Sequence, residues 1–156
     1  MGDSDLARPK PSDISEDLLR RSGNALFNGD FELFASCFAL PQEMETPEGR
    51  KLVESMADLR AVFDGVRDYF RGAGVTKMER RSISARYAAE DRIEATHLSR
   101  LIGGGRAIQS PYPVFSVLLK RDGEWRVSDS KYAISDSPAH RRALSGALKD
   151  AAAAPE

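Results

Sequence analysis

The sequence predicts an α+β fold in which N-terminal helices pack on a curved, mostly antiparallel sheet at the C-terminal end. Apolar residues recur at helical steps of three and four up to about residue 70, and they alternate at the strand period of two beyond Val75. The turn residues Glu90-Asp91, Gly103-Gly104-Gly105 and Asp122-Gly123 separate the later segments. Strands joined so closely run antiparallel, because a parallel link needs about a dozen residues or more.

Three helices and a small hairpin are expected before this sheet. The helices are expected over residues 13–28, 30–38 and 56–71, and the hairpin over residues 40–53. Asp13, Asp30 and Ser55 stand at the helix starts as the expected N-cap residues. Pro41 is expected to stop the second helix. The third helix has the most regular apolar stripe of the chain, from Leu59 to Phe70.

Four strands are expected after the long helix, over residues 76–88, 92–102, 112–121 and 124–133. If Lys120 lies opposite Trp125, large apolar side chains fall on both faces of the last hairpin. One face then carries Val114, Leu118, Trp125 and Val127, and the other carries Phe115, Val117, Leu119 and Tyr132. In a monomer, the sheet face that is in contact with water has no need of large apolar side chains. We therefore expect a homodimer that forms through the sheet.

The chain is expected to form a single domain over residues 12–135. A flexible arm of residues 1–11 precedes it, and a weakly helical tail of residues 136–156 follows it. The 156 residues include 23 Lys and Arg against 24 Asp and Glu, so no global field favours nucleic acid or an anionic membrane. No secretory signal or membrane-spanning run is recognisable, which makes the cytoplasm the expected location.

Three short segments, together with the order of elements, carry a resemblance to a known fold. They are Asn28-Gly29-Asp30, Ser55-Met56-Ala57-Asp58-Leu59 and Arg121-Asp122-Gly123-Glu124-Trp125-Arg126-Val127. Over roughly Ile14 to Ser135 the chain resembles the nuclear-transport-factor-2-like superfamily, a cystatin-like α+β cone, and in particular its SnoaL-like bacterial members. The resemblance implies a pocket between the helices and the concave sheet face. It leaves the function open, because the superfamily includes isomerases, cyclases and dehydratases alongside binding modules and dimerisation domains.

His97 is the first candidate for chemistry. It shares the strand alternation of Ile93 and Ala95, which predicts that its ring faces the less polar side of the sheet. A histidine held in a pocket can act as a general base or as a hydrogen-bond donor. The alternative is a structural histidine that is bonded to a neighbouring group.

Asp129 is the second candidate. It follows Trp125 and Val127 at the strand period, which predicts that its carboxylate lies on the same face as these apolar side chains. Burial among apolar groups raises the pKa of a carboxyl group and fits it for acid or base work. The alternative is a carboxylate at the rim, paired with Lys131 or Arg126.

Four aromatic residues are the candidate ligand-binding residues. They are Phe34, Tyr69, Tyr112 and Trp125. Two histidines and one cysteine, without the spacing of a metal site, predict neither a metal nor another cofactor. The short basic clusters 77–81 and 140–142 are expected to be solvated.

The sequence therefore predicts binding of a small, largely apolar molecule in the pocket. Its catalytic form would be cofactor-free proton transfer, as in an isomerase, cyclase or dehydratase. The alternative is a non-catalytic dimerisation or ligand-sensing module whose pocket is filled by its own side chains.

Overall fold

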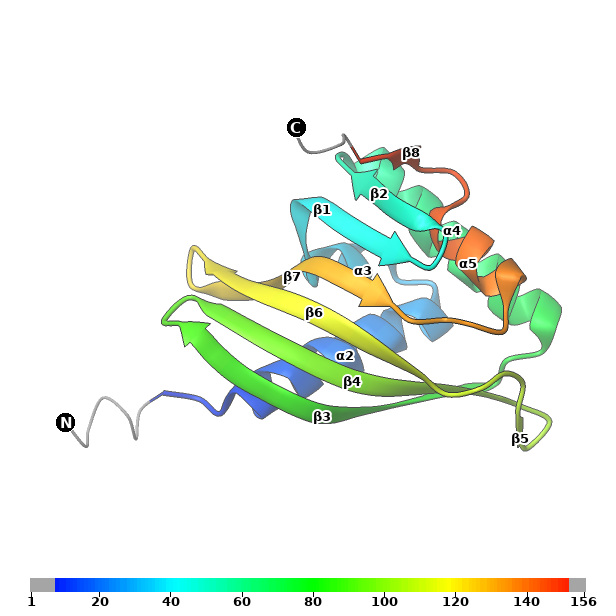
Figure 1. Cartoon of the computed structure of the whole chain (residues 1–156), viewed down its shortest axis with the longest axis horizontal. Helices are drawn as coiled ribbons and strands as arrows, with labels where there is room; N and C mark the ends of the chain where they lie inside the picture. The colour runs from blue at the N-terminus through cyan, green and yellow to red at the C-terminus, as the bar shows by residue number, and fades with distance from the viewer. Residues whose placement is uncertain (1–7, 152–156) are drawn as a thin grey trace.

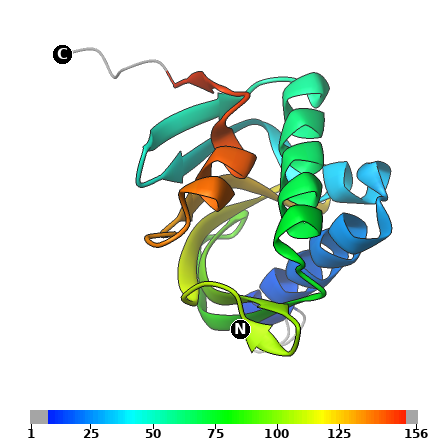
Figure 2. The ribbon, with the colours of Figure 1, turned by 90° about the vertical axis from the view of Figure 1, so that its right-hand side faces the viewer.

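The structure, a computed structural model, describes residues 8–151 and consists of one curved sheet wrapped around helices (Figure 1; Figure 2). In this part of the chain the helices are α2 (Pro11–Asn28), α3 (Phe31–Ser36), α4 (Met56–Ala73) and α5 (Pro138–Ser145). They lie on the concave side of the sheet in Figure 2. Residues 1–7 of the predicted flexible arm and residues 152–156 of the predicted tail lie outside the described residues.

The sheet joins nearly all the extended segments of the chain. Its strands are β1 (Phe38–Thr46), β2 (Gly49–Val53), β3 (Lys77–Ala89), β4 (Arg92–Gly103), β5 (Arg106–Ala107), β6 (Tyr112–Arg121), β7 (Glu124–Tyr132) and β8 (Lys149–Asp150). They follow the order β3-β4-β6-β7-β1-β2-β8, and β5 pairs with the end of β4. Only β1 and β7 run parallel among the described strands. The predicted α+β class is confirmed, and the small hairpin is part of the main sheet.

Two of the predicted helix caps are confirmed. The side chain of Asp30 accepts a hydrogen bond from the Leu33 N–H at 3.1 Å, and that of Ser55 accepts one from the Asp58 N–H at 3.1 Å. Each bond satisfies one of the backbone donors that a helix start leaves without a partner.

The ends of two predicted helices are wrong. α2 starts at Pro11 and not at Asp13, because a proline at the first helical position has no N–H that needs a partner. α3 ends before Phe38, which pairs with Val127 and begins β1. Pro41 therefore lies within a strand and does not stop a helix.

Bulges bend the strands around the helices. The pairing register shifts at Ile83 in β3 and at Ser128 in β7, and in each case one extra residue lies opposite the partner strand. The pairing of β1 with β7 shifts as well, between Phe38 and Glu43. A bulge increases the twist and bend of a strand, and side chains beyond it face the side opposite to the one that strict alternation predicts.

Two apolar clusters fill much of the space inside the curved sheet. The larger one packs α4 against α3, α5 and the sheet, through Leu59, Val62, Phe63, Val66 and Phe70 of the predicted stripe. The smaller one packs Leu18 of α2 on Ile93 of β4 and Leu118 of β6. Burial of these side chains is the main favourable term in the folding of the domain.

The C-terminal helix α5 forms part of the larger cluster. Ser137 caps it by accepting a hydrogen bond from the His140 N–H at 3.2 Å. His140 and Leu144 are buried, so the basic cluster 140–142 is not simply solvated as expected. α5 also lies very close to α4, because a Cβ atom added to Gly65 would be 2.4 Å from the carbonyl oxygen of Ala143.

This close approach generates a stability prediction. Gly65→Ala is expected to lower the free energy of unfolding by about 2–3 kcal/mol, because its methyl group forces α5 away from α4. Gly72→Ala is the matched control on the same helix, since no described atom lies within 4 Å of the added methyl group. It should raise the free energy of unfolding by up to about 1 kcal/mol. Urea denaturation measures both, and equal effects would contradict the close packing.

Candidate functional site

A small interior cavity lies between the helices and the concave face of the sheet. Its main chamber has a volume of about 60 Å³, and an adjoining chamber has about 50 Å³. The two chambers share Ser22, Phe38, Arg80, His97, Val114 and Tyr132. The space is not sealed by hydrocarbon alone, because several of these side chains are polar.

The two walls of the cavity differ in chemistry. The helices contribute mainly apolar side chains, among them Leu26, Leu59, Val62, Val66 and Phe70. The sheet contributes polar side chains in two neighbouring rows across its strands. The first row is Arg80, Ser99 and Tyr112, and the second is His97 and Tyr132 with the apolar Val114 between them. The Ser99 hydroxyl donates a hydrogen bond to the Tyr112 hydroxyl at 3.2 Å.

Arg80 of β3 brings a positive charge to this wall. Its Nη2 donates to the Leu19 carbonyl oxygen of α2 and to the Ser22 hydroxyl, the latter at 3.0 Å. Gly23 leaves room for the guanidinium, because a Cβ atom there would be 2.8 Å from the same Nη2. Burial lowers the pKa of Arg80 below its ordinary value. The expectation that the basic cluster 77–81 is solvated is therefore wrong for Arg80.

Gln42 of β1 is the least satisfied polar residue of the site. It is 1% exposed, and neither its Oε1 nor its Nε2 has a hydrogen-bond partner among the described residues. A buried amide without a partner destabilises the folded state by about 1–3 kcal/mol. Buried polar groups of this kind are rare in folded proteins, and they are typical of sites that a ligand or water completes.

His97 lies on the inner face, as the strand alternation predicts. It is buried, it lines both chambers, and its ring makes no hydrogen bond to a residue between 8 and 151. Burial, and then the nearby charge of Arg80, lower the pKa of His97 to about 3. The ring is therefore neutral at pH 7 and is a weak base.

A second histidine closes the cavity from α5. The Tyr69 hydroxyl donates to Gln109 Oε1 at 2.9 Å, and Gln109 Nε2 lies 3.2 Å from His140 Nδ1. Because Gln109 accepts through Oε1, its Nε2 is the donor that faces His140, and Nδ1 of the histidine is the acceptor. The proton of the neutral ring is therefore on Nε2. Burial lowers the pKa of His140 to about 4, in agreement with a neutral ring. Tyr69 stacks on His140, with ring centroids 4.9 Å apart.

Asp129 does not share the cavity with His97, and the predicted face is wrong. Lys120 pairs with Trp125 as expected, but the bulge at Ser128 places Asp129 opposite Val117 on the outer face. Its carboxylate accepts a hydrogen bond from the Ser128 hydroxyl at 2.7 Å. The two expected partners are engaged elsewhere, since Lys131 pairs with Glu45 and Arg126 with Glu124. The same bulge turns Tyr132 inward, so its predicted position beside Phe115 is also wrong.

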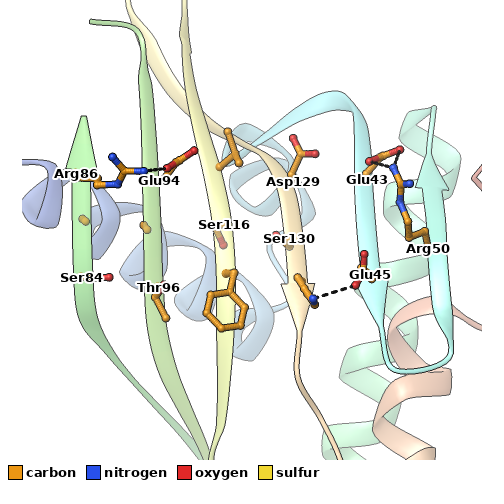
Figure 3. Close-up of a pocket in the computed structure, with 15 residues that line it drawn as sticks. Glu43, Glu45, Arg50, Ser84, Arg86, Glu94, Thr96, Ser116, Asp129 and Ser130 are labelled. Carbon is orange, nitrogen blue, oxygen red and sulfur yellow. Dashed lines mark hydrogen bonds and ion pairs between the residues drawn. The ribbon is translucent and has the colours of Figure 1, made fainter. Parts of the chain in front are cut away.

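The outer face around Asp129 forms an open hollow of about 510 Å³ (Figure 3). Figure 3 shows Asp129 beside Glu43 on the neighbouring strand, and the register pairs the two positions. Arg50 bonds Glu43 at 2.6 Å, and Arg86 pairs with Glu94 at 2.5 Å. The hollow therefore carries charges of both signs and is open to solvent.

The candidate aromatic residues are divided between different places. Phe34 and Tyr112 line the interior cavity. Tyr69 lies behind His140, and Trp125 packs near Tyr87 in the smaller cluster, with ring centroids 6.0 Å apart. The sequence interpretation missed Gln42, Arg80 and His140. One signal was available for Arg80. It alternates along the strand with Met78 and Ser82, which places its side chain on the same face of the sheet as theirs.

Other kinds of site find no support in residues 8–151. No group of three or more His, Cys, Asp or Glu side chains within that range could hold a metal ion. In the same range, every helix is too short or too polar to cross a membrane.

Comparison with known proteins identifies the fold. No protein-family model matches the chain, and no curated protein matches it. The chain is similar to a domain of unknown function with a cystatin-like fold from Nostoc punctiforme, with a TM-score of 0.64 and 16% identity over 86% of this chain and 83% of that chain. A protein of unknown function from Mycobacterium tuberculosis gives a TM-score of 0.64 and 15% identity over 88% and 90% of the two chains.

A third structure carries a provisional activity name. It is a protein from Novosphingobium aromaticivorans that is named provisionally as a scytalone dehydratase, with a TM-score of 0.61 and 14% identity over 86% and 89% of the two chains. At these identities the likenesses show the fold alone. The chain has the nuclear-transport-factor-2-like, cystatin-like fold that the resemblance predicted.

The free amide of Gln42 generates a stability prediction. Gln42→Met removes the unsatisfied polar atoms at similar size, so it should raise the free energy of unfolding by about 1–2 kcal/mol. Gln109→Met is the matched control, because it removes an amide that has partners on both sides. It should lower the free energy of unfolding by about 1–3 kcal/mol. Urea denaturation of both variants measures this, and a loss of stability in Gln42→Met would show that the amide is satisfied.

Proposed function

We propose that this protein binds a small, largely apolar molecule in the interior cavity. The observation that carries the proposal is the buried Gln42 amide, which has no hydrogen-bond partner in residues 8–151. A sequence selected for stability alone would place an apolar side chain at such a position, whereas a polar group kept there at a cost in stability is typical of a binding site.

The walls of the cavity suit a molecule with one apolar side and one polar side. Leu59, Val62 and Val66 of α4 offer a hydrocarbon surface, and the sheet offers the hydroxyl group of Tyr112 and the ring of His97. Ligand sites in proteins commonly combine an apolar lining with a few polar groups that fix the orientation of the ligand.

The volume limits the size of the molecule. The main chamber of about 60 Å³ is far below the range of roughly 300–1,000 Å³ that drug-sized ligands occupy. A water molecule takes up roughly 30 Å³ of liquid, so the cavity as it stands accommodates only a few non-hydrogen atoms. The alternative of a wholly self-filled pocket is less well supported, because space and unsatisfied polar atoms remain together.

The catalytic form of the proposal is cofactor-free proton transfer, with His97 as the group that moves the proton. The ring is neutral, and among the described residues it has no hydrogen-bond partner, so its nitrogens are available to a bound molecule. The low pKa of His97 follows in part from the charge of Arg80. A bound group that offsets this charge raises the pKa of His97 and makes it a stronger base.

We also propose a homodimer that forms through the outer face of the sheet. Phe115 on this face is 46% exposed, and the apolar side chains Val117 and Leu119 lie on the same face of β6. Charges of both signs surround them, which suits a symmetric interface in which the same surface meets itself.

Binding and catalysis are tested with a panel of small ketones, amides and carboxylic acids. We expect NMR shift changes at the methyl groups of Leu59, Val62 and Val114, and loss of these changes in Val66→Phe, whose ring fills the cavity. For any compound that is turned over, His97→Ala should lower kcat/KM by at least about 100-fold. Asp129→Asn, on the opposite face, is the control and should keep the wild-type rate. Equal rates in both variants would remove His97 from the mechanism.

The dimer is tested by light scattering at micromolar concentration. The wild-type protein should give twice the monomer mass of 17.2 kDa. Phe115→Glu should give the monomer mass, because it removes the exposed ring and adds a further carboxylate to a face that already holds Asp129 and Glu94. Met56→Glu changes an exposed apolar side chain on α4 and serves as the control. A wild-type monomer would end this proposal.

A further inference from the structure

We infer that the ligand of the interior cavity carries a carboxylate group, and that Arg80 is the residue that binds it. The inference rests on the proposed function and specifies the chemical class of the molecule. Its basis is the electrostatic imbalance inside the cavity.

Arg80 brings a positive charge into the protein without a negative partner. It forms no ion pair with any carboxylate between residues 8 and 151, and its partners there are the Leu19 carbonyl oxygen and the Ser22 hydroxyl. A guanidinium has five N–H donors, and both recorded bonds start from Nη2. The other nitrogens are therefore available, and a carboxylate accepts two parallel bonds from a guanidinium.

The lining of the cavity contains no acidic residue that could neutralise this charge. Both chambers are lined by Arg80, and neither is lined by an Asp or Glu of the described chain. The Arg80 side chain is half-buried, and holding a charge partly out of water without an ion-pair partner lowers stability. An anionic ligand offsets this cost, whereas a neutral ligand leaves it in place.

A basic hollow on the outside of the protein leads to the same arginine. It lies between α2 and β3 and has a volume of about 420 Å³. Met78 and Arg80 line both this hollow and the main chamber. The hollow also contains Arg20, which is paired with Asp17, and Arg81, against the single acidic lining residue Glu16. The excess of positive charge at Arg80 and Arg81 favours the approach of an anion.

The remaining walls define the rest of the molecule. Opposite the sheet, α4 offers hydrocarbon, so the ligand combines a carboxylate with a short apolar group. Gln42 lies on β1, the fifth strand in the order that begins with β3, and it lines the same chamber as Arg80. Its free amide can bind a second polar atom of the ligand, such as a carbonyl or hydroxyl oxygen.

The test compares each acid with its neutral amide of the same shape. The probes are acetate and acetamide, propionate and propionamide, and isobutyrate and isobutyramide, each titrated at pH 7 in chloride buffer and followed at the cavity methyl signals. The wild-type protein should bind at least one acid tenfold or more tightly than its amide. Arg80→Gln should reduce that preference to less than about twofold. Arg100→Gln, which removes an exposed arginine paired with Glu79, should keep it.

The outcomes separate this inference from the proposed function. If the amides bind in the cavity as tightly as the acids, or if Arg80→Gln keeps the preference, the inference is wrong while the proposed function stands. If no member of the panel binds, both are wrong. If Arg80→Gln does not fold, the titrations of the wild-type protein still test the inference, because they show whether the acids bind more tightly than the amides.

Discussion

The curvature of the sheet determines where each candidate residue of this protein lies. The strands bend around α2 and α4 because bulges interrupt the regular pairing at Ile83 and Ser128. Each bulge also exchanges the faces of all the residues beyond it. His97 lies on β4, which pairs with β6 without a register shift, and its side chain is inside, whereas Asp129 follows Ser128 and lies outside. One extra residue thus separates the two groups that a regular strand would have brought together.

The sequence predicted the fold well wherever a local signal was sufficient. The apolar stripe of α4, the cap at Ser55 and the Asp122-Gly123 turn depend on neighbouring residues only, and all of them are present. The parallel pairing of β1 with β7 depends on contacts between residues far apart in the chain. The period of a single strand does not contain that information, and neither does it reveal a bulge.

The candidate site was predicted only in part, for the same reason. Alternation placed His97 on the inner face, and it was right because β4 pairs regularly with β6. Arg80 was assigned to solvent because a short run of charged residues usually is, and its real surroundings depend on how α2 crosses β3. Gln42 carried no signal, since the absence of a partner is a property of the folded structure.

The polar wall of the cavity also limits how this sequence can change. Gly23 on α2 is the position over which the Arg80 side chain passes, so a methyl group there would compete with the guanidinium for the same space. In an alignment of relatives, glycine at position 23 and arginine at position 80 should therefore be kept or lost together. Such covariation would show that the glycine at position 23 is kept because it leaves space for the guanidinium of Arg80.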